Sequence, residues 1–157
     1  MFKKAFTLTE GVIALGILTL SIVFLVSLGN SYLSILNSIR QRYTALNAVQ
    51  EGLELAIALR NQRIERMDSA NWLGVTGAGN YCLYFETNTS RIVANPSSQP
   101  CNIGIPGYSR LINYSDFDNP ANNDLRNARA VRVKSIVYFF RDRIELDTIL
   151  TKWSPVQ

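Results

Sequence analysis

No charged side chain occurs between Gly11 and Ile39, a run of 29 residues. A helix of about 20 apolar residues is enough to cross the hydrocarbon core of a bilayer. Glu10 stands directly before the run, and Lys3 and Lys4 lie upstream of it, which favours a cytoplasmic N-terminus. An ionised carboxylate costs about 2.5–3.5 kcal/mol at the bilayer centre and less near its surface. We therefore expect a membrane helix on which Glu10 has a partner of opposite charge.

Apolar residues continue beyond this run at steps of three and four, which place them on one face of a helix. No proline precedes Pro96. The sequence thus predicts one helix from Phe6 to about Glu65, roughly 90 Å long at 1.5 Å per residue. Its membrane half is 6–30, and its amphipathic half, 31–66, packs on a head or forms a coiled-coil stalk. The predicted stripe is Leu36, Ile39, Tyr43, Leu46, Val49, Leu53 and Ile57.

Four glycines interrupt the predicted helix, and each costs about 1 kcal/mol relative to alanine. Close packing against another element explains such residues, and so does simple tolerance. The glycines are Gly11, Gly16, Gly29 and Gly52.

Residues 67–157 predict a small head built on an antiparallel sheet, so the fold class is α+β. Residues 81–86 and 91–94 are expected to form two strands joined by a turn. The stretch 95–107 is rich in Pro, Ser and Gly and is expected to be irregular. The stretch 116–127 has four Asn and three Asp and predicts an exposed polar loop.

A second hairpin is predicted at the end of the chain, with strands at 131–140 and 144–153. The apolar pattern changes phase near Ser135, which indicates a bulge. A turn centred on Asp142 sets Glu145 and Asp147 opposite Phe139 and Val137, away from the cations earlier in the strand. We therefore expect no cross-strand ion pair from Arg132 or Lys134.

Cys82 and Cys101 are the two cysteines of the chain, and both follow the membrane segment. With the N-terminus in the cytoplasm they lie on the extracytoplasmic side, where an even count predicts a disulfide. The bond encloses 18 residues and contributes about 3 kcal/mol by restricting the unfolded chain. The alternative is two free thiols.

The sequence offers little for catalysis, a metal or a cofactor. Histidine is absent, which removes the commonest general base and a leading metal ligand. Asp116 and Asp118 are the one candidate carboxylate pair, and a solvated loop explains them better. We expect no enzyme activity, no metal site and no cofactor.

The charge balance does not favour nucleic acid as a partner. The formal net charge is +4, and Lys3 and Lys4 supply half of it. A basic cluster near the end of the chain is interpreted as a solvated sheet edge, with contact to DNA or a partner protein as the alternative. It consists of Arg126, Arg129, Arg132 and Lys134.

The N-terminus resembles that of type IV prepilins and of the related pseudopilins of type II secretion. Two lysines, a small residue, a phenylalanine and a glutamate four residues later carry the resemblance. Ala5 stands where the family usually has Gly, and Thr9 where it has an apolar residue. The resemblance implies that a membrane-embedded prepilin peptidase cuts between Ala5 and Phe6 and that the new amine of Phe6 is methylated.

The family layout, a long N-terminal helix on an antiparallel head, matches the elements expected here. The resemblance implies that Glu10 pairs with the N-terminal amine of a neighbouring subunit, and that the filament segment can melt locally, as at Gly16 or Gly29. It implies other pilins, the peptidase and an inner-membrane assembly platform as partners. The protein is expected in the bacterial inner membrane and then in an extracytoplasmic filament. The ending 150–153 resembles that of some minor pilins.

Two other classes of protein remain open from the sequence. One is a secreted binding domain whose signal peptide ends before Asn30. The other is a single-pass anchored binding domain that is never cut. The mature N-terminus distinguishes all three classes, and 1–5 is a leader peptide only in the pilin class.

Overall fold

The computed structural model describes residues 8–65, 71–75 and 77–152. The chain forms two compact units, residues 1–41 and the head, residues 42–157. The helix α1 covers Leu8–Glu65 and ends where the sequence predicts. Its predicted first residues, and Trp153 at the predicted end of the last strand, lie outside the described residues.

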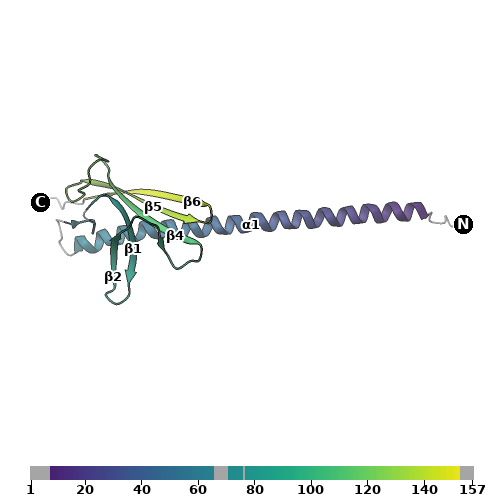
Figure 1. Ribbon diagram of the computed structural model, residues 1–157, viewed down its shortest axis with the longest axis horizontal. Helices are drawn as coiled ribbons and strands as arrows, with labels where there is room; N and C mark the ends of the chain where they lie inside the picture. The colour runs from purple at the N-terminus through teal and green to yellow at the C-terminus, as the bar shows by residue number, and fades with distance from the viewer. Residues whose placement is uncertain (1–7, 66–70, 76, 153–157) are drawn as a thin grey trace. The chain divides into compact units, whose positions relative to one another are not determined.

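The head contains a six-stranded sheet in which every pairing is antiparallel. Its order is β2-β1-β4-β5-β6 (Figure 1), and the short β3 pairs with β4. This arrangement confirms the α+β class. The strands are β1 (Gly79–Glu86), β2 (Arg91–Pro96), β3 (Cys101–Asn102), β4 (Tyr108–Asp116), β5 (Ala130–Phe139) and β6 (Asp142–Thr151).

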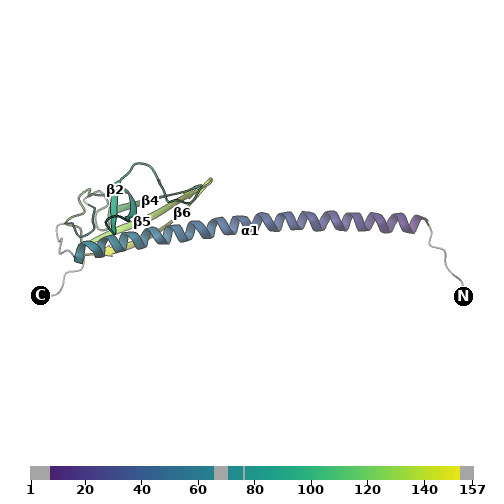
Figure 2. The same ribbon diagram turned by 90° about the horizontal axis from the view of Figure 1, so that it is seen from below.

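The second half of α1 packs along one face of the sheet (Figure 2). The face it buries is not the predicted stripe, which shares only Val49 with it. Tyr43 is 65% exposed, while Leu46, Leu53 and Ile57 are half-buried beside the contact. Small side chains fill the centre because they let the helix backbone come close to the strands. The buried helix residues are Ala45, Ala48, Val49, Gly52, Ala56 and Leu59.

Gly52 marks the closest approach of α1 to the sheet. A Cβ atom at this position would lie 2.8 Å from Cδ of Arg110 and 2.9 Å from Cδ1 of Ile112, and closer still to Oγ of Ser135. Carbon atoms normally pack at about 3.5–4.0 Å. Close packing, one of the two explanations open from the sequence, therefore applies to Gly52.

Two groups of buried side chains form the core beneath the helix. The larger group joins Leu59 of α1 to the sheet through Trp72, Leu73 and Tyr114. The smaller group joins Val49 to the far end of β5. Its members are Ala45, Ala48, Val49, Val137 and Phe139.

The β5–β6 hairpin differs from the prediction in register. Phe139 pairs with Asp142, so Phe140 and Arg141 alone form the turn. This moves Asp147 opposite Lys134, and the expectation of no ion pair is wrong. Nε of Arg132 lies 3.7 Å from Oδ2 of Asp147. The diagonal partners Lys134 and Glu145 approach to 3.5 Å.

The expected bulge at Ser135 is also wrong. The pairing of β5 with β4 and with β6 runs without interruption through this residue. Ser135 is fully buried and continues the inward row of Val131, Val133 and Val137. The row changes from valine to serine at the point where α1 comes closest, so the residue is small because space is short.

Candidate functional site

The predicted N-terminal site is described only in part. Ala5 and Phe6, which flank the expected cut, lie outside the described residues. Glu10 lies in the first turn of α1 with an exposed side chain. A carboxylate in the first turn interacts favourably with the helix dipole.

The helix that follows Glu10 presents an apolar surface on all sides. Every Val, Ile, Leu, Phe and Tyr between Val12 and Ile39 is exposed, from 41% at Leu36 to 72% at Leu20. The helix is long and apolar enough to cross a membrane, with a mean hydropathy of 2.6 over its best window. Apolar surface of this extent indicates contact with lipid or with other protein.

Two hydroxyl groups within this surface bind the helix backbone. Oγ1 of Thr19 donates to the carbonyl of Gly16 at 2.9 Å, and Oγ of Ser21 donates to the carbonyl of Ile17 at 2.8 Å. Such bonds satisfy polar side chains where water is absent. The surface around these residues is therefore suited to an apolar environment.

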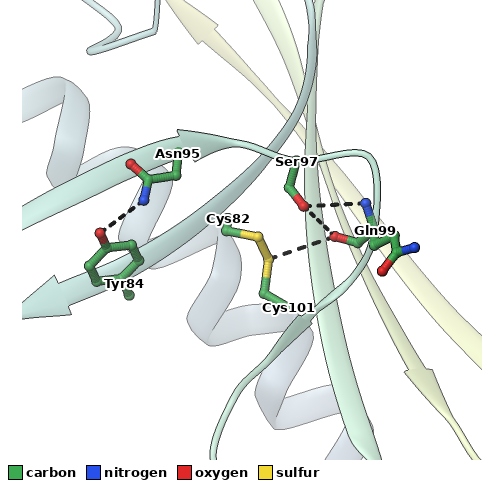
Figure 3. The surroundings of a disulfide bond; sticks show 6 residues. All are labelled: Cys82, Tyr84, Asn95, Ser97, Gln99 and Cys101. Carbon is green, nitrogen blue, oxygen red and sulfur yellow. Dashed lines mark hydrogen bonds between the residues drawn. A yellow bond between two sulfur atoms is a disulfide. The ribbon is translucent and has the colours of Figure 1, made fainter.

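A disulfide joins Cys82 of β1 to Cys101 of β3, as predicted (Figure 3). The two Cα atoms are 5.9 Å apart. β3 lies within the stretch expected to be irregular, and only its two residues pair with β4. The disulfide thus holds an otherwise irregular segment against the sheet.

A cleft opens where β1 leaves β4. These strands pair only from Gly79–Tyr81 to Ile112–Tyr114, and from Cys82 onward β1 pairs with β2 alone. β3 takes its place beside Arg110. The cleft has a volume of about 330 Å³. Its lining includes Glu51 and Leu55 of α1, Leu83 and Phe85 of β1, the disulfide of Cys82 and Cys101, Ile103, and Arg110 and Ile112 of β4.

Arg110 lies at the base of this cleft and is 5% exposed. Its Nη1 donates to the carbonyl of Ala48 at 3.0 Å and lies 3.3 Å from Oε1 of Glu51. Ala48 is four residues before Gly52, whose missing side chain leaves room for Cδ of Arg110. Arg110 therefore joins β4 to the helix, and both of its contacts are within the head.

Sequence reasoning missed Arg110 because it assigned no strand to 108–115. The signal was present in an alternation of large and small residues. Tyr108, Arg110, Ile112 and Tyr114 share one face. The opposite face carries Ser109, Asn113 and Ser115, with the large Leu111 as the exception.

The carboxylate of Asp116 organises the polar loop that follows β4. Its Oδ1 accepts the backbone N–H groups of Asp118 and Asn119, at 3.0 and 3.3 Å. Its Oδ2 accepts Nδ2 of Asn122 at 2.8 Å. These bonds, that from Asn122 above all, lower the pKa of Asp116. The carboxylate is thus used in building the loop.

Several residues of the basic cluster have acidic partners. Arg126 binds Asp124 through Nη2 at 2.8 Å, and this contact lowers the pKa of Asp124 to about 2. Arg132, besides its contact with Asp147, lies 5.5 Å from the ring centre of Phe117. Lys134 faces Glu145. The positive charge of the cluster is therefore largely compensated on the head itself.

Among the described residues, no group of three or more His, Cys, Asp or Glu side chains is placed to hold a metal ion. No family model, curated protein or solved structure matches this chain.

Proposed function

We propose that this protein is a structural subunit, of the minor pilin kind, in a type IV pilus or a type II secretion pseudopilus. It has no catalytic activity of its own in this proposal. It enters the inner membrane with its N-terminus in the cytoplasm and is cut before Phe6. It then leaves the bilayer to join an extracytoplasmic filament.

The apolar surface of α1 is the observation that carries this proposal. From Val12 to Ile39 the bulky apolar side chains of the helix are exposed. A bilayer covers such a surface before assembly, and the helices of neighbouring subunits cover it afterwards. The motif from Lys3 to Glu10 at the start of this surface favours the filament over a simple anchor.

Glu10 has a specific role in the proposal. Cleavage before Phe6 removes Lys3 and Lys4 and creates a positively charged amine four residues from Glu10. In a filament this amine meets Glu10 of an adjacent subunit and compensates a carboxylate that is costly in apolar surroundings. N-methylation leaves the charge of the amine in place.

The head supplies what distinguishes this subunit from others in the same filament. The disulfide fixes the segment around Cys101, and Asp116 fixes the long polar loop. Exposed loops of this kind differ readily between subunits of one architecture. The partners of the head are then other pilins, and the assembly platform acts on the membrane half.

The mature N-terminus tests the proposal. The intact mass and the N-terminal fragment spectrum of protein from its native cells should give a chain that begins at N-methyl-Phe6. A chain that begins at Asn30 would instead indicate a secreted domain. A chain that retains Met1 would indicate an uncut membrane anchor, and either result would refute the pilin proposal.

A further inference from the structure

The turn between β5 and β6 carries an exposed aromatic ring that is followed by two arginines with Asp142 between them. Phe140 is 70% exposed, and Arg141 and Arg143 are exposed beside it. Its ring centre lies 6.1 Å from that of Tyr108, in a T-shaped arrangement. Most of its apolar area therefore faces solvent.

Phenylalanine is also an unusual residue type for the backbone conformation of this turn. Its φ is 52°, in the left-handed region that favours glycine or asparagine and is unusual for a bulky residue. An exposed phenylalanine there adds little to the core and strains the backbone. The identity of this residue is thus better explained by a contact outside the head.

Chain connectivity places the turn near one end of the apolar run. Oδ2 of Asp142 lies 3.8 Å from Nη2 of Arg42, so the turn lies beside Arg42 within the head. Arg42 follows Ile39, the last residue of the run, by three residues. Three residues span at most about 11 Å even when fully extended. The turn is therefore held close to wherever the run ends.

The length of the uncharged run, from Gly11 to Ile39, indicates where its end lies in a bilayer. As a helix, 29 residues measure about 43 Å, close to the roughly 40–45 Å of a bilayer with its headgroups. The uncharged residues 31–39 thus continue the membrane half, 6–30, through the headgroup layer, and the end of the run lies at the outer surface of that layer. Aromatic side chains are common at both membrane–water interfaces, and a cation near a bilayer surface is attracted to anionic lipids.

We infer that the β5–β6 turn, formed by Phe140 and Arg141 and flanked by Arg143, is a contact site for the bilayer surface. It binds anionic lipid headgroups while the subunit waits in the membrane, and it orients the head before assembly. This inference rests on the membrane insertion of α1 in the proposed function. It does not depend on cleavage before Phe6 or on the filament.

Fluorescence quenching in vesicles tests the contact with the full chain. The native cysteines are joined in the disulfide, so an introduced cysteine takes the label alone. Three labelled variants are compared: Arg141→Cys at the turn, Ala121→Cys in the loop at the opposite end of β5, and Ile22→Cys in the run. The vesicles contain one part phosphatidylglycerol to two parts phosphatidylcholine, with a quencher on the headgroups or in the acyl chains.

The headgroup quencher should act on the label at residue 141 and not on that at residue 121, and the acyl-chain quencher should act on the label at residue 22. If residue 22 is quenched and residue 141 behaves like residue 121, the contact is refuted while the anchor stands. If residue 22 is not quenched, both the anchor and the contact fail. Shielding of residue 141 that depends on protein density, without lipid quenching, would assign the surface to a second copy and overturn the inference.

Two further variants, made in the Arg141→Cys background, separate lipid contact from turn stability. Phe140→Asn should reduce headgroup quenching and leave the melting temperature of the head unchanged or higher, because asparagine tolerates positive φ. Arg143→Gln should lower the ratio of docked to undocked heads by about fivefold. Arg129→Gln, its matched control next to the opposite end of β5, should leave this ratio unchanged. Equal effects of both arginine variants would contradict a site at the turn.

Discussion

Gly52 is the residue on which the closeness of helix and sheet depends. Gly52→Ala should destabilise the head although alanine is the better helix former by about 1 kcal/mol. The new methyl group has to displace Arg110, Ile112 and Ser135, and overpacking of this kind costs about 1–3 kcal/mol. We expect a net loss, measured as a lower denaturant midpoint of the full chain in detergent by the fluorescence of Trp72.

Gly29→Ala is the matched control for this prediction. Gly29 is in the same helix, and a Cβ atom there meets nothing within 4 Å. The Gly29→Ala variant should leave the denaturant midpoint of the head unchanged. If Gly52→Ala were as harmless as Gly29→Ala, the close approach of α1 to the sheet would be wrong.

Asp116 gives the head a dependence on pH. The folded state lowers the pKa of this carboxyl, so its stabilising effect is complete above its ordinary value of 3.8 and is lost as the pH falls through the lower, folded value. Asp116→Asn should destabilise the head at pH 7, because an amide nitrogen replaces an acceptor facing Asn122 or the backbone N–H groups.

The difference in melting temperature between wild type and Asp116→Asn should therefore shrink as the pH falls below 3.8. Asp118→Asn serves as the control, because in the described loop it is the backbone of Asp118, rather than its carboxylate, that binds Asp116. A difference that stays constant from neutral to acid pH would exclude a role for the charge of Asp116.

At the level of elements, the type and order of the helix and hairpins follow from the sequence, but their exact contacts do not. The steps of three and four among large residues predict a helix, and α1 ends at Glu65 as expected. They mislead about its buried face, because the contact is centred on Ala45, Ala48 and Gly52. The pattern of apolar spacing assigns large side chains to the buried face, whereas a helix that packs close to a sheet has small side chains at the contact.

The register of the β5–β6 hairpin is the second limit of the sequence pattern. The prediction centres the turn on Asp142, a residue type that is common in turns. The structure turns at Phe140 and Arg141, and the φ of 52° at Phe140 is not suggested by its residue type. A shift of this kind changes every cross-strand neighbour, which is why the pairing of Asp147 with Arg132 was missed.

The disulfide makes the β1–β3 region depend on redox conditions. Reduction should lower the stability of the head by about 3 kcal/mol, since the bond restricts the unfolded chain. It should also release β3, which has two residues paired with β4, and expose 95–107 to protease. Melting curves and limited proteolysis in oxidising and reducing buffers measure both effects.

The double variant Cys82→Ser, Cys101→Ser is the control for this prediction. It should melt like the reduced wild type and should not respond to reductant. Identical melting of the wild type in both buffers would show that the bond does not stabilise the head.

For the whole molecule, the two units pose different problems for sequence analysis. The head closes its core within one chain, so burial and pairing test what was expected of it. The described part of the first unit has an exposed apolar surface, which lipid or neighbouring subunits cover only in the proposed function. The structure of one chain therefore does not test the role of Glu10, which stays a prediction.

Glu10 provides the test of assembly at this scale. Glu10→Gln and Glu10→Ala should insert into the membrane as the wild type does, because each removes a charge that is costly near lipid. Both should be incorporated poorly into filaments, since the amine of a neighbouring subunit then lacks its partner. Membrane fractionation and immunoblotting of sheared filaments from native cells measure the two steps separately.

Glu54→Gln is the control for this prediction. Glu54 is an exposed acid on the same helix within the head, so this variant should assemble normally. Normal incorporation of both Glu10 variants would refute the proposed pairing, and loss of membrane insertion would show that Glu10 acts earlier than assembly.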